Sequence, residues 1–170
     1  MTQQEYENKI KELEKQIAEL KMAKVEEPQS KRWKPKYNEI YWLVEGGDIF
    51  NSHWFNDRGD KWRSLIGNCF ETEEEAEEYK KQIEYTARYK NYIEEHSKPL
   101  DWGNNDQGKY YAYFMQNSPY TMGPVNKLEI DCDYWSKCQG IIYASSKQII
   151  LDAINKIGED NFKKYVLGVK

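Results

Sequence analysis

The sequence is poor in the residues on which most catalytic and metal sites depend. His53 and His96 are the only histidines among 170 residues, and neither belongs to a His-x-x-x-His or Glu-x-x-His pattern. Those spacings place two ligands on one face of a helix. A glycine-rich phosphate-binding loop is also missing, because the pair Gly46 and Gly47 is typical of a hairpin turn. We therefore expect a protein that is not an enzyme and holds neither a cofactor nor a metal ion.

Cysteine is scarce as well. Cys69, Cys132 and Cys138 are odd in number and irregularly spaced, so they do not form a disulfide framework, and reduced thiols are expected. A zinc site built from Cys132, Cys138, Asp131 and Asp133 is the alternative. The five residues between the two cysteines do not match a zinc knuckle, and no second cysteine pair exists. Structural thiols are the preferred interpretation.

Long apolar runs are absent. No segment approaches the roughly 20 apolar residues that cross a bilayer. The first residues also lack the basic-then-hydrophobic pattern of a signal peptide, so a cytoplasmic protein is expected.

Net charge is low too: a value of −4 is neither the basic field of a nucleic-acid binder nor the strong acidity of a DNA mimic. Aromatic residues are plentiful, with 14 Tyr, six Trp and five Phe, and they supply apolar area for a core.

Residues 1–27 predict a coiled-coil helix. Ile10 and Ile17 occupy a positions of a heptad, and Leu13 and Leu20 occupy d positions. Isoleucine at a with leucine at d favours a parallel two-stranded coil, so we expect these four residues to form a homodimer. The alternative is a helix that packs against its own domain, although such a helix usually has a wider apolar face.

Residues 28–36 are predicted to be a basic linker. Two prolines and high polarity favour a linker over a helix or strand. An alternative nucleic-acid site would combine phosphate contacts with base stacking, using Lys31, Arg32, Trp33, Lys34 and Lys36. We prefer a solvated lead-in to the first strand, because only four positive charges are involved.

A possible internal duplication organises the rest of the sequence. A shift of 73 residues aligns Asp60 with Asp133 and Trp62 with Trp135. The same shift aligns Tyr37 with Tyr110, Tyr41 with Phe114, Gly67 with Gly140, Phe70 with Tyr143, and Thr72 with Ser145. Only four identical pairs occur over residues 37–83, so the inference depends on the order of the landmarks, which predicts one ββ…βα unit occurring twice. Asp60 and Asp133 could form a pair of functional carboxylates, but turn acceptors are the simpler interpretation.

We therefore predict an α+β fold with two related small ββ…βα modules, each an antiparallel sheet with packed helices, after the N-terminal coiled-coil helix. The boundaries are 37–98 for the first module, 99–108 for a second linker and 109–170 for the second module. In the first module we expect strands at 39–45 and 49–55, a turn at 56–60, short strands within 61–70, and a long acidic helix capped by Thr72. In the second we expect strands at 109–115, 128–132 and 140–143, a helix capped by Ser145, and a last helix at 159–167.

Several short motifs resemble a known family. They are Tyr41-Trp42, the block from Ile66 to Ala76, Asp101-Trp102, Tyr110-Tyr111 and the ending from Ile157 to Val169. Over residues 33–170 they resemble small uncharacterised proteins from phages and prophages of low-GC Gram-positive bacteria. The resemblance implies an accessory phage protein in the host bacterial cytoplasm, of the kind that acts against host immunity, as anti-CRISPR proteins do. It implies no catalytic residues.

The preferred functional hypothesis is a dimeric inhibitor that binds a host defence protein, such as a CRISPR-type nuclease. Exposed aromatic side chains would anchor the contact, and acidic side chains would occupy a basic groove of the partner protein. The candidate residues are Glu73, Glu74, Glu77, Glu78, Trp54 and Trp62. In the alternative interpretation, Trp54, Trp62 and Trp135 are core residues and the glutamates are merely solvated. Nucleic-acid binding through the linker and sequestration of a small nucleotide in an aromatic pocket are the other hypotheses.

Overall fold

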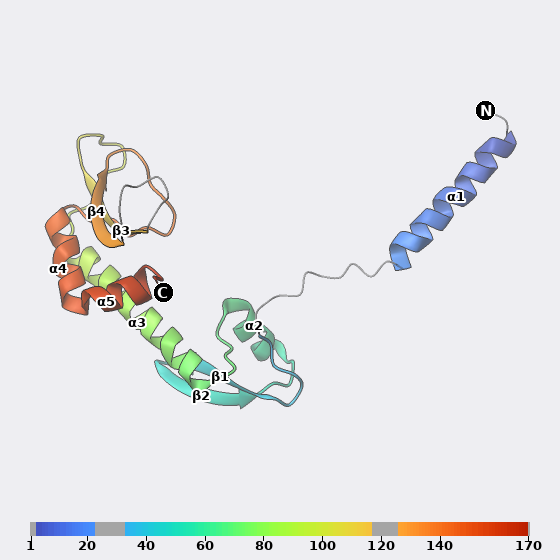
Figure 1. Cartoon of the computed structure of the whole chain (residues 1–170), viewed down its shortest axis with the longest axis horizontal. Coiled ribbons are helices and arrows are strands. Elements are labelled where there is room, and N and C mark those ends of the chain that lie inside the picture. Colours follow the sequence, from blue (N-terminus) through green and yellow to red (C-terminus); the bar gives the residue numbers. More distant parts are fainter. Residues whose placement is uncertain (1–2, 23–32, 117–125, 170) are drawn as a thin grey trace. The chain divides into compact units, whose positions relative to one another are not determined.

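The computed structural model describes residues 3–22, 33–116 and 126–169 and shows an α+β protein (Figure 1). The chain divides into two units, Met1–Trp33 and Lys34–Lys170. The elements are α1 (Gln3–Met22), β1 (Ile40–Glu45), β2 (Asp48–His53), α2 (Arg58–Ile66), α3 (Glu73–His96), β3 (Lys109–Met115), β4 (Lys127–Asp133), α4 (Lys147–Ile157), α5 (Glu159–Asn161) and the π-helical turn η1 (Phe162–Val166). None of the described helices is both long enough and apolar enough to span a bilayer.

The first unit contains the predicted N-terminal helix. Three apolar side chains at helical spacing, Tyr6, Ile10 and Leu13, are 60%, 44% and 51% exposed. The side chains of Ile17 and Leu20 lie outside the described residues. The helix is therefore present, with part of its predicted seam open to solvent, whereas its pairing with a second copy stays a prediction.

The second unit begins with the predicted hairpin. β1 and β2 pair antiparallel from Ile40↔His53 to Glu45↔Asp48. Gly46 and Gly47 form the turn with φ values of 61° and 92°, which are favourable for glycine because it lacks a Cβ atom. The buried face of β1 is formed by Tyr41 and Leu43, while the opposite face is half-buried or exposed.

The strands predicted within residues 61–70 are wrong, because this segment is mostly helical. Asp57 and Asp60 form a capping box at the start of α2, and Gly67 ends the helix with φ 88°. These two local signals define a short helix where the apolar residues had suggested strands. Only Phe70 pairs in a β manner, through backbone hydrogen bonds of 2.9 Å in both directions with Trp42. The predicted turn at 56–60 is instead the beginning of α2.

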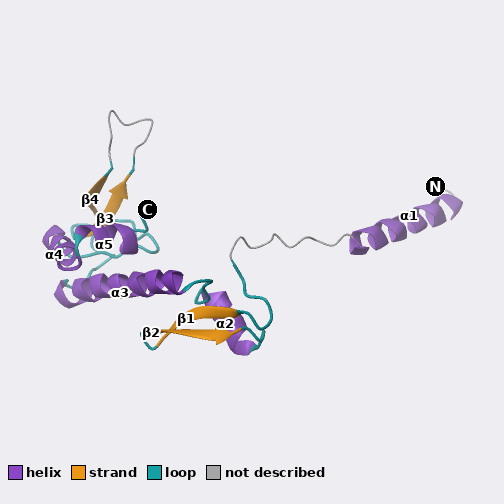
Figure 2. Cartoon of the chain, turned by 60° about the horizontal axis from the view of Figure 1, so that its bottom comes forward, coloured by secondary structure: helices purple, strands orange, loops and turns teal. Residues whose placement is uncertain are grey.

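The long acidic helix is confirmed and connects the two halves of the second unit (Figure 2). Its predicted N-cap is present, because Thr72 Oγ1 accepts a hydrogen bond of 3.2 Å from the Glu75 amide. α3 contacts both strands of the first hairpin, α4 and η1. Its contacts with η1 include Glu78, near the start of the helix, and Thr86. Tyr89 and Ile93 of α3 belong to the main core, together with Ile150 and Phe162.

The second half repeats the order of a hairpin followed by a helix. β3 and β4 pair antiparallel from Lys109↔Asp133 to Met115↔Lys127. The predicted strand at 140–143 is reduced to a single bridge between Tyr110 and Ala144. The predicted N-cap Ser145 is wrong by one residue: Ser146 caps α4, because its Oγ accepts from the Ile149 amide. The predicted last helix is present as α5 and η1.

Both halves contain an antiparallel hairpin with one bridged residue beyond it, but α2 has no counterpart among the described residues of the second half. In each half, the first strand of the hairpin is bridged to a residue two positions before the N-cap of the next helix. The 73-residue shift, however, aligns Asp60 in α2 with Asp133, the last residue of β4. The duplication therefore stays a prediction.

The core contains one buried hydroxyl that gives a first prediction. Tyr89 is 2% exposed, and no described residue forms a hydrogen bond with its hydroxyl, whose pKa burial raises. Removing an unpaired buried hydroxyl ends its desolvation cost, so Tyr89→Phe should increase the free energy of unfolding by about 1 kcal/mol. Urea denaturation measures the change. Tyr41→Phe is the control and should be destabilising, because the Tyr41 hydroxyl donates to Asp60. A Tyr89→Phe variant that is less stable than wild type would contradict the conclusion that the Tyr89 hydroxyl is buried without a hydrogen-bond partner.

An ion-pair cluster between α3 and η1 gives a second prediction. Glu78 lies 2.6 Å from Lys164 Nζ and 3.1 Å from Lys81 Nζ, and it accepts a hydrogen bond from the Tyr165 hydroxyl. Lys164 and then Lys81 lower the pKa of Glu78 from 4.5 to about 2. Its stabilising effect should therefore be complete above pH 4.5 and disappear as the pH falls toward 2. The Glu78 side chain is 44% exposed, so we expect the solvent-screened cluster to contribute no more than about 1 kcal/mol.

Urea denaturation of wild type and Glu78→Gln at several pH values tests this effect. The difference between the two proteins should be largest near neutral pH and should shrink as the pH approaches 2. The comparison with Glu78→Gln removes the contributions of the other carboxyl groups. A difference that stays constant with pH would show that Glu78 contributes no charge-dependent stability.

Candidate partner-binding site

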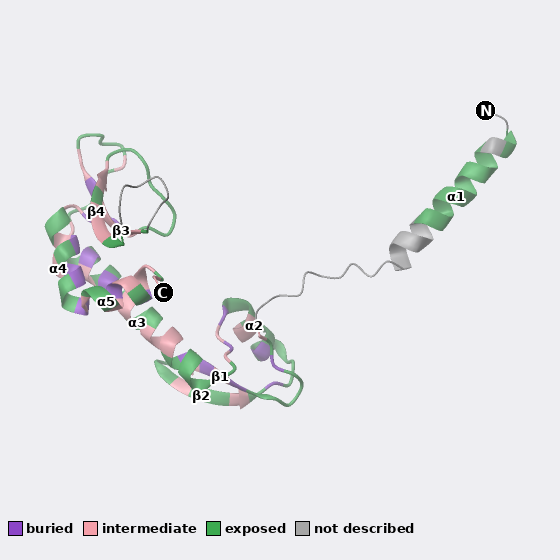
Figure 3. Cartoon of the chain, viewed as in Figure 1, coloured by how far each residue is buried: buried purple, intermediate pink, exposed green. Residues whose placement is uncertain are grey.

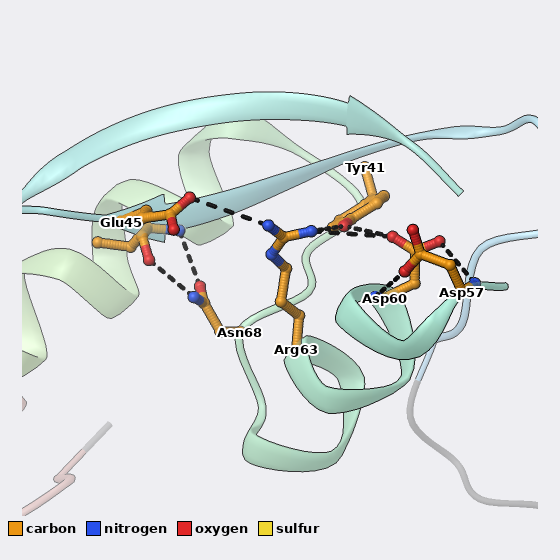
Figure 4. A network of polar contacts seen from close by, with 7 residues as sticks. Tyr41, Glu45, Asp57, Asp60, Arg63 and Asn68 are labelled. Carbon is orange, nitrogen blue, oxygen red and sulfur yellow. Dashed lines mark hydrogen bonds and ion pairs between the residues drawn. The ribbon is translucent and has the colours of Figure 1, made fainter. Parts of the chain in front are cut away.

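A polar network around a buried carboxylate holds α2 against β1 (Figure 4). Asp60 is only 2% exposed. Its Oδ1 accepts a hydrogen bond of 2.9 Å from the Tyr41 hydroxyl, and its Oδ2 accepts one of 2.7 Å from the Phe55 amide. Arg63 Nη1 donates to the Tyr41 hydroxyl at 3.0 Å. The network therefore joins the inner face of α2 to the strand and to the segment that follows β2.

The protonation states fit a structural role for this network. Burial alone would raise the pKa of Asp60, but hydrogen bonds from Tyr41 and from backbone amides lower it below its usual value. Burial, followed by the hydrogen bond to Asp60, raises the pKa of Tyr41. Asp60 thus stays ionised as an acceptor, and Tyr41 stays protonated as a donor. Asp60 also accepts from the Asp57 amide as part of the capping box of α2, so it is a helix-capping residue rather than the predicted turn acceptor.

The C-terminal end of α2 is attached to β1 by a second set of contacts (Figure 4). The side-chain amide of Asn68 accepts from the Val44 amide at 2.8 Å and donates to the Val44 carbonyl at 2.7 Å. It thereby supplies the backbone of β1 with the partners that a neighbouring strand would supply. Arg63 Nη2 also lies 3.9 Å from a Glu45 oxygen. Both ends of α2 are therefore fixed, and its outer face has a defined orientation.

The outer face of α2 is a shallow, largely apolar hollow that we call the α2 surface, lined by Arg58, Gly59, Lys61, Trp62 and Leu65. Trp62 is 60% exposed and Leu65 is 76% exposed. Most of α2 is accordingly exposed, apart from the inward Asp60 (Figure 3). A large aromatic and a large aliphatic side chain are thus exposed to solvent on a helix whose inner face is attached to β1.

Residues 37–66, which include α2, contain many exposed apolar side chains. Phe55 packs edge-on against Tyr37 at 6.1 Å and stacks with the His53 ring at the same centroid distance. About half of the exposed large apolar side chains of the described residues fall within positions 37–66, namely Tyr37, Ile40, Phe50, Phe55, Trp62, Leu65 and Ile66. Such concentrations of exposed apolar area typically mark interaction sites.

The structure separates the two tryptophans that were predicted to bind a partner. Trp54 is 2% exposed and packs edge-on against Tyr41 at 5.8 Å, so it belongs to the core and is not available for a contact. Trp62 is exposed on α2.

The four predicted glutamates also differ from one another. Glu73, Glu74 and Glu77 are exposed on the first turns of α3. Glu78 is half-buried and already bound to Lys164, Lys81 and Tyr165 of its own chain. Only the first three are therefore open to a partner's charges.

Only some of the residues in the alternative nucleic-acid site belong to the described part of the chain. Lys31 and Arg32 lie outside the described residues. Trp33 is half-buried and ends the first unit, while Lys34 and Lys36 are exposed at the start of the second unit. The basic linker therefore stays a prediction.

Sequence reasoning missed Arg58, Lys61 and Leu65 as site residues. Their spacing places them with Trp62 on one side of a helix, and the capping box of Asp57 could have revealed that helix.

The second Asp-x-Trp pair also places its tryptophan at the surface. Asp133 accepts hydrogen bonds of 2.9 Å from the amides of Trp135 and Ser136, and Trp135 is 73% exposed. In both pairs the tryptophan lies at the surface, but Asp60 is a buried acceptor within α2, whereas Asp133 is an acceptor in a turn after β4. Trp135 was therefore also missed as an exposed aromatic residue.

No protein-family model, curated protein or solved structure matches the chain. The resemblance to phage accessory proteins therefore stays a prediction. Among the described residues, no group of three or more His, Cys, Asp or Glu side chains is placed to hold a metal ion. The α2 surface is the candidate site that the geometry defines best.

Proposed function

We propose that the chain is a protein-binding protein that acts without catalysis and contacts its partner through the α2 surface. The observation that carries this proposal is the exposure of Trp62 and Leu65 side by side on one helix face. A few residues, among which tryptophan is enriched, supply most of the binding energy at protein interfaces, and an adjacent leucine adds apolar area to the contact.

The hydrogen bonds that attach α2 to β1 support the same proposal. Asp60, Arg63 and Asn68 hold the helix against β1 from the inside, so the outer side chains need little ordering when a partner binds. Preorganisation of this kind lowers the entropic cost of association. A buried polar network beneath an exposed apolar face is therefore suited to binding.

Two further features extend the proposal. The exposed side chains of α1 can pair with a second copy, and a dimer would present two α2 surfaces and gain avidity for a repeated target. The resemblance in sequence suggests a host defence protein, such as a CRISPR-type nuclease, as the target. That target class is proposed on the resemblance alone.

Replacing both Trp62 and Leu65 with alanine tests the proposal. The tagged wild-type protein is used to capture partners from nuclease-treated bacterial lysate. The double variant should retain the captured protein about tenfold less well or worse, because it loses the central anchors of the contact. The fold should be unaffected, since both side chains are largely exposed.

Trp135→Ala is the matched control, since it removes an equally exposed tryptophan from the other Asp-x-Trp pair. It should retain the captured protein as wild type does. Equal retention by the double variant and the wild type would exclude the α2 surface as the contact.

A further inference from the structure

We infer that the partner presents an acidic amphipathic segment to the α2 surface, with a bulky apolar side chain next to aspartate or glutamate. This inference rests on the proposed function and specifies the chemistry of the partner at the same site. It follows from the charges that border the apolar part of the hollow.

Two positive charges on the α2 surface have no carboxylate partner in the described part of the chain. Arg58 and Lys61 both line the hollow and are exposed, and neither takes part in an ion pair there. Arg63, on the inner side of the same helix, lies 3.9 Å from both Asp60 and Glu45. Among the described residues, carboxylates thus pair with the inner cation of α2 but not with the two cations beside Trp62 and Leu65.

The spacing of these residues fits a segment that lies along α2. Arg58, Lys61 or Trp62, and Leu65 follow one another at intervals of three or four residues, so they line one side of the helix. A bulky side chain of the partner can pack between Trp62 and Leu65, as in helix-in-groove recognition. Carboxylates beside it would reach Arg58 and Lys61, and arginine binds a carboxylate in two-point geometry.

A nucleic acid is the less suitable occupant. Stacking of a base on Trp62 is possible, but single-stranded nucleic acids bind along an extended basic groove. The α2 surface has only two cations, and Leu65 offers an aliphatic side chain rather than a stacking face. Asp57 precedes Arg58 directly, and the exposed Glu73 and Glu74 follow a few residues after α2. These carboxylates would repel a polyanion more than a short acidic segment.

Selection from a displayed library of random 12-residue peptides tests the inference. The full-length wild-type chain, the charge-reversed variant Arg58→Glu/Lys61→Glu and the variant Trp62→Ala serve as separate targets. Arg58 is the first residue of α2, where a glutamate interacts favourably with the helix dipole, so the charge-reversed chain should fold. Circular dichroism verifies that all three proteins have the same helix content.

We expect the wild-type chain to enrich peptides in which Trp, Phe or Leu is flanked by Asp and Glu. Charge reversal should change the flanking residues to Lys and Arg, and Trp62→Ala should abolish enrichment. A synthetic peptide with the acidic consensus sequence should bind the wild-type chain with an affinity about tenfold higher, or more, than its affinity for the charge-reversed variant. This difference in affinity should decrease as the salt concentration rises. A fluorescent single-stranded oligonucleotide, titrated in parallel, should bind all three proteins equally weakly.

Three results would overturn the inference. The wild-type chain could enrich no peptides beyond those that Trp62→Ala enriches, or it could select the same flanking residues as the charge-reversed variant. The third result is oligonucleotide binding that requires Trp62. Failure here differs from failure of the proposed function. If Trp62 and Leu65 are needed to retain a protein from lysate but the selected peptides show no charge preference, the contact surface is correct and the acidic partner is wrong.

Discussion

Replacing Asp60 with alanine should lower the free energy of unfolding by about 3–5 kcal/mol, since the variant leaves several buried groups without partners. The Tyr41 hydroxyl and the Phe55 amide both donate to this carboxylate, and the Arg63 guanidinium lies 3.9 Å away. The variant also removes one half of the capping box of α2. Urea denaturation, followed by circular dichroism, measures the loss.

Asp133→Ala is the matched control, because Asp133 is the equivalent residue of the second Asp-x-Trp pair. It accepts two amide hydrogen bonds at a solvent-accessible turn, so we expect a much smaller loss than for Asp60→Ala. Equal losses for the two variants would show that the buried network does not stabilise α2 more than an ordinary turn does. Asp60→Ala should also weaken partner binding, because α2 loses its attachment to β1.

Replacing Lys109 with methionine should lower the free energy of unfolding by about 2–4 kcal/mol, because two hydrogen bonds to a charged group are lost. Lys109 is fully buried, and its Nζ donates to the carbonyls of Asn104 at 2.7 Å and Tyr134 at 3.1 Å. The same ammonium lies 5.4 Å from the centre of the Trp102 ring. One lysine thus connects the segment before β3 to the segment after β4, while methionine has a similar length and no donor.

Lys137→Met is the control for this variant. Its Nζ lies 5.7 Å from the same Trp102 ring, but the residue is exposed, so we expect a change below about 0.5 kcal/mol. Hydrogen exchange localises the effect, and amides of residues 100–108 and 134–140 should exchange faster in Lys109→Met alone. A Lys109→Met variant as stable as wild type would show that the cost of burying the ammonium offsets its hydrogen bonds.

The elements that the sequence predicted well are those with local signals. The turn at Gly46 and Gly47 requires positive φ, and Thr72 with Glu75 marks a helix start, so the first hairpin and α3 were both predictable. The cap of α4 was misplaced because Ser145 and Ser146 are adjacent. Only the fold shows that the Ser145 hydroxyl accepts from the Lys98 amide, which leaves Ser146 to cap the helix.

The α2 helix was missed for a physical reason. A short apolar run such as Trp62, Leu65 and Ile66 fits a strand or a helix equally well when it spans fewer than ten residues. The capping box of Asp57 and Asp60 distinguishes the two, but the same residues also resemble a turn.

The exposure of each tryptophan also depends on the fold. Trp54 and Trp62 lie only eight positions apart, and one is buried while the other is exposed. That difference arises from the way α2 packs on β1, which involves residues up to 24 positions apart. The sequence could therefore suggest aromatic anchors without distinguishing the surface anchor from the core residue.

Photocrosslinking from position 62 tests the central claim most directly. A benzophenone amino acid replaces Trp62 in one protein and Trp135 in another, and both are irradiated in bacterial lysate with and without nuclease treatment. The account predicts a discrete protein adduct from position 62 that persists after nuclease treatment and is absent from position 135. No adduct from position 62, the same adducts from both positions, or an adduct that nuclease removes would contradict protein binding through the α2 surface.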